Sequence, residues 1–156
     1  MRVYADTSFL VKLLSAEAES EAASALYRKL ALPPLFFLPL HALEVRNAIL
    51  QRAFHLRRSL SSGERQHITR ERDVALARLQ RYVSRRVLVE VNVDMDVPIS
   101  RATELSLAHA ERIGARAIDL LHVACALVLE TELFLTTDER QARLAKAEKL
   151  KVVSLA

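Results

Sequence analysis

Four carboxylates in this 156-residue sequence fall at positions where they could act together. Asp6 directly follows Arg2–Ala5, a run that predicts a short strand, and Asp138 follows a second predicted strand at Leu133–Leu135 after two threonines. Because the strands of a parallel sheet end at the same edge, both side chains are expected to project there. With two further acids in predicted helices, the candidate catalytic set is Asp6, Glu44, Asp119 and Asp138.

Asp119 is the most informative of the four acids. It lies in the first turn of a helix predicted over Ala117–Glu130, whose other side chains are nearly all apolar. An ionised carboxylate in such surroundings costs free energy unless it is paired or bound to a cation. The position of Asp119 therefore indicates a function that needs a buried negative charge.

Each acid also has a simpler interpretation on its own. Asp6 and Asp138 are suited to cap helix N-termini, and Asp138 with Gln141 has the pattern of a capping box. Asp119 would be favoured at a helix N-terminus, and Glu44 could be a solvated helix residue. None of these roles requires four carboxylates to converge, so the whole set favours a shared site.

The chemistry that such a cluster supports is metal-dependent hydrolysis of a phosphodiester. Hard divalent cations such as Mg²⁺ take oxygen ligands, and a cation held by carboxylates makes water nucleophilic and neutralises charge on a scissile phosphate. Without a cation, four neighbouring acids would repel one another and raise each other's pKa. Attack by water would leave a 5′-phosphate and a 3′-hydroxyl.

Other chemistries fit the sequence less well. Asp6 could be the nucleophile of an aspartyl-phosphate enzyme, but position 8, where haloacid-dehalogenase-type enzymes place a second aspartate, is Ser8. Two glycines in the chain cannot supply a glycine-rich dinucleotide motif or a phosphate-binding loop. Cys125 and His122 lie in an apolar helical pattern. This pattern favours Cys125 as a small core residue rather than a nucleophile. It favours His122 as a core histidine bonded to a neighbour rather than a residue of the site.

The elements that must position the acids alternate along the chain. Strands are predicted at Arg2–Ala5, Leu35–Leu38, Val87–Val93, Leu133–Leu135 and Val152–Val153. Helices are predicted at Phe9–Leu14, Glu17–Leu30, Leu40–Leu56, Glu64–Ser84, from Asp96 toward Ile113, Ala117–Glu130 and Asp138–Lys146, with a turn at Ser59–Gly63. This alternation predicts an α/β fold with a parallel sheet covered on both faces, in a single domain over residues 1–156.

Charge is concentrated in one segment of the chain, about residues 52–86, which we call the basic arm. It holds ten Arg, no Lys and three acids, which gives a net charge of +7. The rest of the chain carries a net charge of −3, so the total is +4. The asymmetry suits a polyanion such as nucleic acid, although a solvated helical hairpin or a surface for an acidic protein would have the same composition. The candidate phosphate-binding residues are Arg57, Arg58, Arg65 and Arg72 in the arm, and Arg116 beside Asp119.

Four motifs occur in an order that resembles PIN-domain ribonucleases. They are AspThrSer at 6–8, LeuGluValArgAsnAla at 43–48, AspLeuLeuHisValAlaCysAla at 119–126 and LeuThrThrAsp at 135–138. The match covers essentially the whole chain and is closest to VapC-type toxins of toxin–antitoxin pairs. It implies a three-layer α/β/α sandwich with a mainly parallel sheet, Mg²⁺ or Mn²⁺ held by the four acids, endonucleolytic cleavage of RNA, a cognate antitoxin and a homodimer.

The resemblance also indicates supporting residues and leaves two alternatives open. Thr7 and Thr136 match a hydroxyl often found near the site, though either could bond locally. Asn47 lies one helical turn from Glu44. It could bind a metal-bound water, or it could be an amide on the helix surface. The arginine-rich arm is longer than in the compact toxins. The alternatives are a PIN-domain nuclease of RNA processing and a non-catalytic module that binds RNA or protein.

The expected location is the cytoplasm, without a membrane association. A single cysteine excludes an internal disulfide, and no run approaches the roughly 18 apolar residues that would span a bilayer. The N-terminus meets an acid at position 6, which does not fit the apolar core of a signal peptide.

Overall fold

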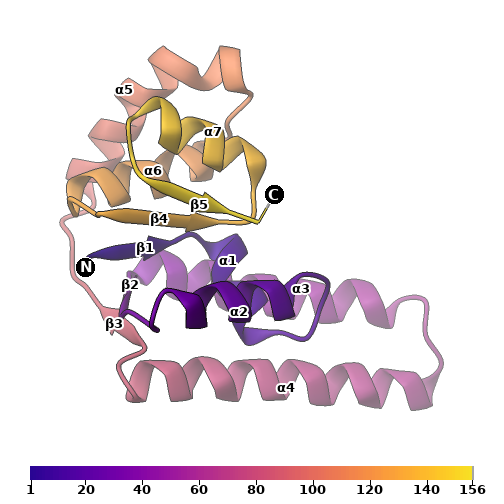
Figure 1. Ribbon diagram of the computed structural model, residues 1–156. Coiled ribbons are helices and arrows are strands. Elements are labelled where there is room, and N and C mark those ends of the chain that lie inside the picture. Colours follow the sequence, from indigo (N-terminus) through magenta and orange to yellow (C-terminus); the bar gives the residue numbers. More distant parts are fainter. Residues whose placement is uncertain (156) are drawn as a thin grey trace.

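Five short parallel strands form the centre of the structure, a computed structural model that describes residues 1–155 (Figure 1). The strand order is β3-β2-β1-β4-β5, and every neighbouring pair is parallel. The strands are β1 (Val3–Ala5), β2 (Leu35–Phe37), β3 (Leu88–Glu90), β4 (Leu133–Thr136) and β5 (Val152–Ser154). The predicted parallel α/β sheet is confirmed; the first three strands are shorter than predicted, and the last two are each one residue longer.

Helices cover both faces of the sheet, which gives the predicted three layers (Figure 1). On one face lie α1 (Thr7–Leu14), α2 (Ser20–Lys29), α3 (Pro39–Arg57) and α4 (Ser62–Ser84). On the other lie α5 (Asp96–Ile113), α6 (Ala117–Val128) and α7 (Glu139–Ala147). Successive side chains of a strand point to opposite faces, so Val3 and Ala5 belong to one core and Tyr4 to the other. Burial on both faces explains why the inner strands β1 and β2 are apolar throughout.

The order of the strands reverses beside β1, which lies between β2 and β4. The register pairs Val3 with Leu133 and Ala5 with Leu135, and the Asp6 N–H donates to the Leu135 carbonyl over 2.9 Å. Asp6 therefore leaves the sheet beside Thr136, the last residue of β4. A crevice at the carboxyl ends of two strands, where their order reverses, is where parallel α/β folds bind ligands.

The basic arm comprises the last turns of α3 and the whole of α4, two helices that run side by side and extend past the sheet (Figure 1). The predicted turn at its tip, Ser59–Gly63, is confirmed, but it ends two residues earlier than predicted. Gly63 lies in the first turn of α4, because Ser61 N–H donates to the Glu64 carboxylate over 2.9 Å and begins the helix at Ser62. The turn itself comprises residues 58–61.

No helix within residues 1–155 is long and apolar enough to cross a membrane.

Four helices end on a left-handed residue that is not glycine. These residues follow α2, α4, α6 and α7 and are Ala31, Arg86, Glu130 and Lys149, with φ between 50° and 64°. After α7, the N–H of Lys149 donates to the Lys146 carbonyl and the N–H of Leu150 to the Ala145 carbonyl, each over 3.0 Å. This is the Schellman pattern, which normally places glycine at the left-handed position because a Cβ is disfavoured there.

Replacing Lys149 by glycine should therefore stabilise the protein. We expect the free energy of unfolding of Lys149→Gly to rise by about 0.5–1 kcal/mol, the steric penalty of the left-handed residue less the backbone entropy of glycine. In thermal unfolding this corresponds to roughly 1–4 °C for a chain of this size. The control Lys149→Ala removes the same charge but keeps the Cβ, so its melting temperature should not rise. A gain equal in both variants would assign the effect to the charge.

Candidate active site

Asp6 is fully buried where β1 passes into α1. Its Oδ1 accepts hydrogen bonds from the Phe9 N–H over 2.9 Å and from Ser8 Oγ over 2.7 Å. Its Oδ2 accepts from Thr136 Oγ1 over 2.5 Å. The predicted helix cap is thus confirmed, and the same bonds fix the carboxylate at the carboxyl edge of the sheet.

Asp138 follows β4 and caps α7 in the same way. Its Oδ1 accepts from the N–H groups of Arg140 and Gln141 over 2.8 and 3.2 Å, which confirms its predicted capping role. Its own N–H donates to Thr136 Oγ1 over 2.9 Å. Because the same hydroxyl also donates to Asp6, Thr136 joins the two aspartates into one network.

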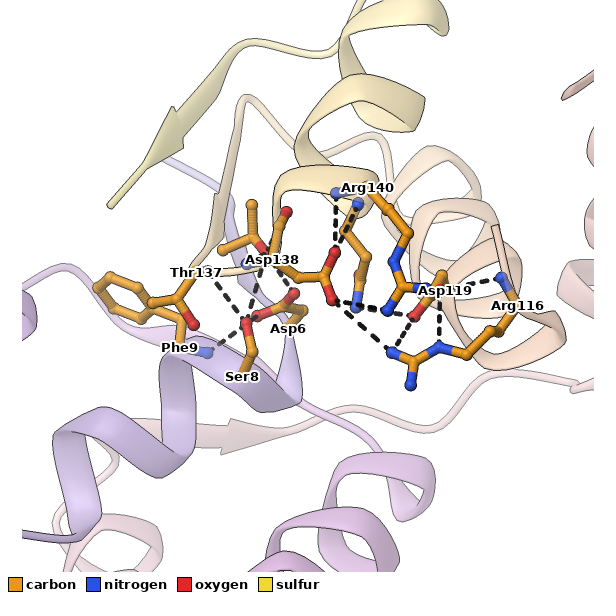
Figure 2. A network of polar contacts seen from close by, with 10 residues as sticks. Asp6, Ser8, Phe9, Arg116, Asp119, Thr137, Asp138 and Arg140 are labelled. Atoms are coloured by element: carbon orange, nitrogen blue, oxygen red, sulfur yellow. Dashed lines mark hydrogen bonds and ion pairs between the residues drawn. The ribbon is translucent and has the colours of Figure 1, made fainter. Parts of the chain in front are cut away.

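Asp119 is fully buried in the first turn of α6 and forms an ion pair with Arg116 (Figure 2). Its Oδ2 accepts from the backbone N–H and from Nε of Arg116 over 2.9 and 3.2 Å, and its Oδ1 accepts from Arg116 Nη2 over 3.2 Å. Arg116 Nη2 also lies 3.6 Å from Asp138 Oδ2. One guanidinium thus lies between two of the acids, and hydrogen bonding to Asp119 raises the pKa of Arg116.

Glu44 projects from α3 toward the other acids and is 24% exposed. Its Oε2 accepts from Thr7 Oγ1 over 2.9 Å and from His122 Nε2 over 2.5 Å. Thr7 is the neighbour of Asp6 in the chain, and His122 lies three residues after Asp119 on α6. Glu44 is therefore bound by one side chain next to Asp6 and by another from the helix that carries Asp119.

The structure brings together most of the residues that the sequence selected. Thr7 and Thr136 both bond to the acids, whereas the exposed Asn47 makes no hydrogen bond within the described residues. Three polar contacts to the acids were missed or underrated by sequence reasoning, and they come from Ser8, His122 and Gln141. The last of these donates from Nε2 to Asp119 Oδ1 over 3.4 Å. The catalytic role of the four acids stays a prediction.

Burial sets the protonation chemistry around the site. Desolvation raises the pKa of Asp6 above its ordinary value, although the bonds from Thr136 and Ser8 act in the opposite direction. Desolvation also lowers the pKa of His41 well below its usual value and raises the pKa of the Cys125 thiol to about 11. The interpretation of Cys125 as a core residue agrees with its complete burial.

The donor atoms at this edge fit a hard divalent cation in their chemistry. They are carboxylate and hydroxyl oxygens, the ligands that Mg²⁺ and Mn²⁺ prefer, and the site already attracts one positive group, Arg116. They do not form a finished ligand cage, because no three Asp, Glu, His or Cys side chains within residues 1–155 lie close enough to hold a metal ion together. Water molecules would complete the coordination of a cation held by one or two of these carboxylates, as is usual for Mg²⁺.

The candidate phosphate-binding residues lie in two separate regions of the structure. Arg116 lies at the acids, whereas Arg57, Arg58, Arg65 and Arg72 line a groove of about 550 Å³ in the α3–α4 hairpin. A larger cavity of about 720 Å³ lies between α3, α4 and the segment after β3, and none of the four acids lines it. The size of a cavity therefore does not by itself indicate the acidic site.

Comparison with known proteins places this arrangement in a family. A profile described as the PIN domain matches residues 3–147. The fold is similar to that of FitAcB from Neisseria gonorrhoeae, with 16% identity and a TM-score of 0.60 over 96% of this chain and 95% of that one. It is also similar to PAE2754 from Pyrobaculum aerophilum, with 14% identity and a TM-score of 0.57 over 99% and 90% of the two chains. No curated protein sequence matches the chain.

The burial of Asp6 predicts a pH-dependent stability effect. A carboxyl whose pKa is raised in the folded state destabilises the fold at every pH above that raised pKa, and the cost disappears as the pH falls below its unfolded value. In the presence of a chelator, Asp6→Asn should therefore melt above the wild type at pH 7–8. The difference in melting temperature should shrink under acidic conditions. The control is Glu139→Gln, which removes a surface carboxyl and should not show this dependence on pH. If Asp6→Asn were less stable than the wild type at pH 8, the prediction would be wrong.

Proposed function

Because the chain belongs to the PIN domain family, we propose that it is a Mg²⁺- or Mn²⁺-dependent endoribonuclease of the VapC toxin type. Family membership supports a nuclease, and the metal, the RNA substrate and the toxin role are the finer parts of the proposal. The observation that carries it is the convergence of Asp6, Asp119 and Asp138 at the reversal point of the sheet, with Glu44 beside them. That convergence is what metal-assisted phosphodiester hydrolysis requires.

In this proposal Asp6, Asp119 and Asp138 hold the cation, and Glu44 completes the site by ligation or by orienting the attacking water. The cation supplies Lewis-acid stabilisation of the phosphate and lowers the pKa of water. Asp6 cannot turn away, because three donors hold its carboxylate. Its orientation therefore needs no rearrangement during the reaction, which is the condition for efficient electrostatic catalysis.

Arg116 has two roles in this proposal. Without a metal, its guanidinium offsets the charges of Asp119 and Asp138. Its side chain is 59% exposed, so it can leave these carboxylates at small cost when a cation replaces it. Released, it is in position to contact the RNA phosphate at the cleavage site, as a guanidinium does readily.

The basic arm is proposed to bind the RNA backbone away from the cleavage site. Of the four arginines that line its groove, Arg57, Arg58 and Arg65 form no ion pair with an acid within the described part of the chain. The Nε of Arg57 is buried there without a hydrogen-bond partner, and Arg58 lies over the ring of the exposed Phe54. Positive charge beside an exposed aromatic ring suits a polynucleotide.

The remaining parts of the proposal are a cognate antitoxin and a homodimer, as the VapC resemblance implies. A toxin must be harmful when its antitoxin is absent. Expression of the wild-type chain alone should therefore arrest bacterial growth, and expression of Asp6→Asn should not. Growth arrest by both would indicate a cause other than the acidic site.

The test of the nuclease uses purified protein and a mixed total-RNA pool, with Mg²⁺ or Mn²⁺ and with EDTA. We expect discrete fragments that require the metal and carry 5′-phosphate ends. The rate of Asp6→Asn should fall at least about 100-fold, because metal-based stabilisation of the transition state amounts to several kcal/mol. Fragments with 2′,3′-cyclic phosphate ends would contradict the mechanism, since they would make the 2′-hydroxyl the nucleophile. Undegraded RNA that still binds would favour a non-catalytic module.

The arm predicts how RNA binding depends on salt. Replacing Arg57, Arg58, Arg65 and Arg72 by alanine should lower the slope of log K against log salt concentration by up to about 3, since each lost phosphate contact accounts for roughly 0.7 on single strands. Fluorescence anisotropy with a labelled RNA between 50 and 200 mM salt, about the range of strong dependence, measures it. The control replaces four exposed cations elsewhere, Arg28, Lys29, Arg143 and Lys146, and removes the same charge. An equal slope in both variants would reject the arm as the binding surface.

A further inference from the structure

A chain of hydrogen bonds leads from the middle of the sheet to Glu44. Tyr4 Oη lies 2.8 Å from His122 Nδ1, and His122 Nε2 lies 2.5 Å from Glu44 Oε2. The three residues come from β1, α6 and α3, so these hydrogen bonds connect the sheet with helices of both layers. Tyr4 and His122 are buried, at 0% and 1% exposure, and only Glu44 reaches solvent.

One assignment of donors and acceptors satisfies all three groups. An ionised carboxylate accepts only, so His122 Nε2 carries the hydrogen that is donated to Glu44. With Nε2 as the donor, a ring that carries one proton accepts at Nδ1, and Tyr4 Oη donates to it. Tyr4 keeps its proton, because burial raises its pKa well above the ordinary value. The tyrosine therefore sets the tautomer of His122, and the histidine orients the carboxylate.

Both donors to Glu44 act on the same oxygen. Thr7 Oγ1 and His122 Nε2 each bond to Oε2, over 2.9 and 2.5 Å. Oε1 therefore stays available for a cation or a water molecule. A flexible glutamate is in this way held in one orientation, with a single oxygen presented to the site.

We propose that His122 is a positioning residue for Glu44 in the nuclease reaction, held in its tautomer by Tyr4. The inference rests on the proposed function, since the role of Glu44 does. It explains why a polar ring is buried on a helix whose neighbours are apolar, where a leucine would fill the space without needing three polar partners. His122 does not touch the substrate and acts only through the carboxylate.

The decisive experiment measures Mn²⁺ binding by electron paramagnetic resonance, without RNA. His122→Leu should weaken the affinity by about 10–100-fold, the usual effect of losing a group that orients a metal ligand. His122→Gln should retain most of the affinity, because its Nε2 can donate at the position of the histidine Nε2. His122→Asn reaches only as far as Nδ1, so it should bind like His122→Leu. Cleavage rates should follow the same order.

Two further variants separate positioning from general damage. His109→Leu breaks a chemically similar pair, His109 Nε2 to Glu148 at 2.6 Å between α5 and α7, and should leave Mn²⁺ affinity unchanged. In a Glu44→Ala background, His122→Leu should cause no additional loss of affinity, because the two residues act as a unit.

The outcomes distinguish this inference from the function on which it rests. Wild-type protein that binds no Mn²⁺ would overturn both. Binding of Mn²⁺ with equal affinity by wild type and His122→Leu would overturn the positioning role alone. If His122→Leu does not fold, the glutamine and asparagine variants decide the question, and equal affinities of these two would contradict the proposal.

Discussion

The burial of negative charge at one edge of the sheet is the constraint on which this structure depends. Asp6 and Asp119 are both fully buried, and two buried carboxylates close to a third acid are costly unless each charge is compensated. Compensation comes from local groups. Phe9 N–H binds Asp6, and Arg116 binds Asp119 with its backbone N–H and its guanidinium. The helix N-termini therefore stabilise the same carboxylates that the proposed reaction uses.

This constraint explains why the acids lie at the ends of elements. A residue that follows a strand and precedes a helix meets free N–H groups, as Asp6 and Asp138 do. Because β1 and β4 are parallel neighbours in register, the two caps also lie at one edge. The capping role and the site role are thus two consequences of one position, and the simpler interpretation of each aspartate does not compete with the functional one.

Local patterns in the sequence were sufficient for the elements and for the aspartates. The alternation of strands and helices, and the acids at their ends, depend on residues a few positions apart. The contacts of Glu44 were not predictable in this way, because His122 is 78 positions away and which faces of α3 and α6 meet is decided by packing. The end of the turn in the arm was placed two residues too late for a different, local reason, since Gly63 suggested a turn while the Ser61–Glu64 bond begins the helix. The left-handed helix ends at residues such as Arg86 and Lys149 carry no glycine to signal them.

The four acids differ in how firmly the fold holds them, and this difference bears on how a cation would bind. Asp6 is fixed by donors that are buried or part-buried, and Glu44 by Thr7 and His122. The main partner of Asp119 is the side chain of Arg116, which is 59% exposed and also approaches Asp138. A cation gains most where the group that it displaces is hydrated easily, and a guanidinium at the surface meets that condition. In the proposed enzyme, the buried donors therefore set the geometry of the site, while the exposed arginine adjusts its affinity for the metal.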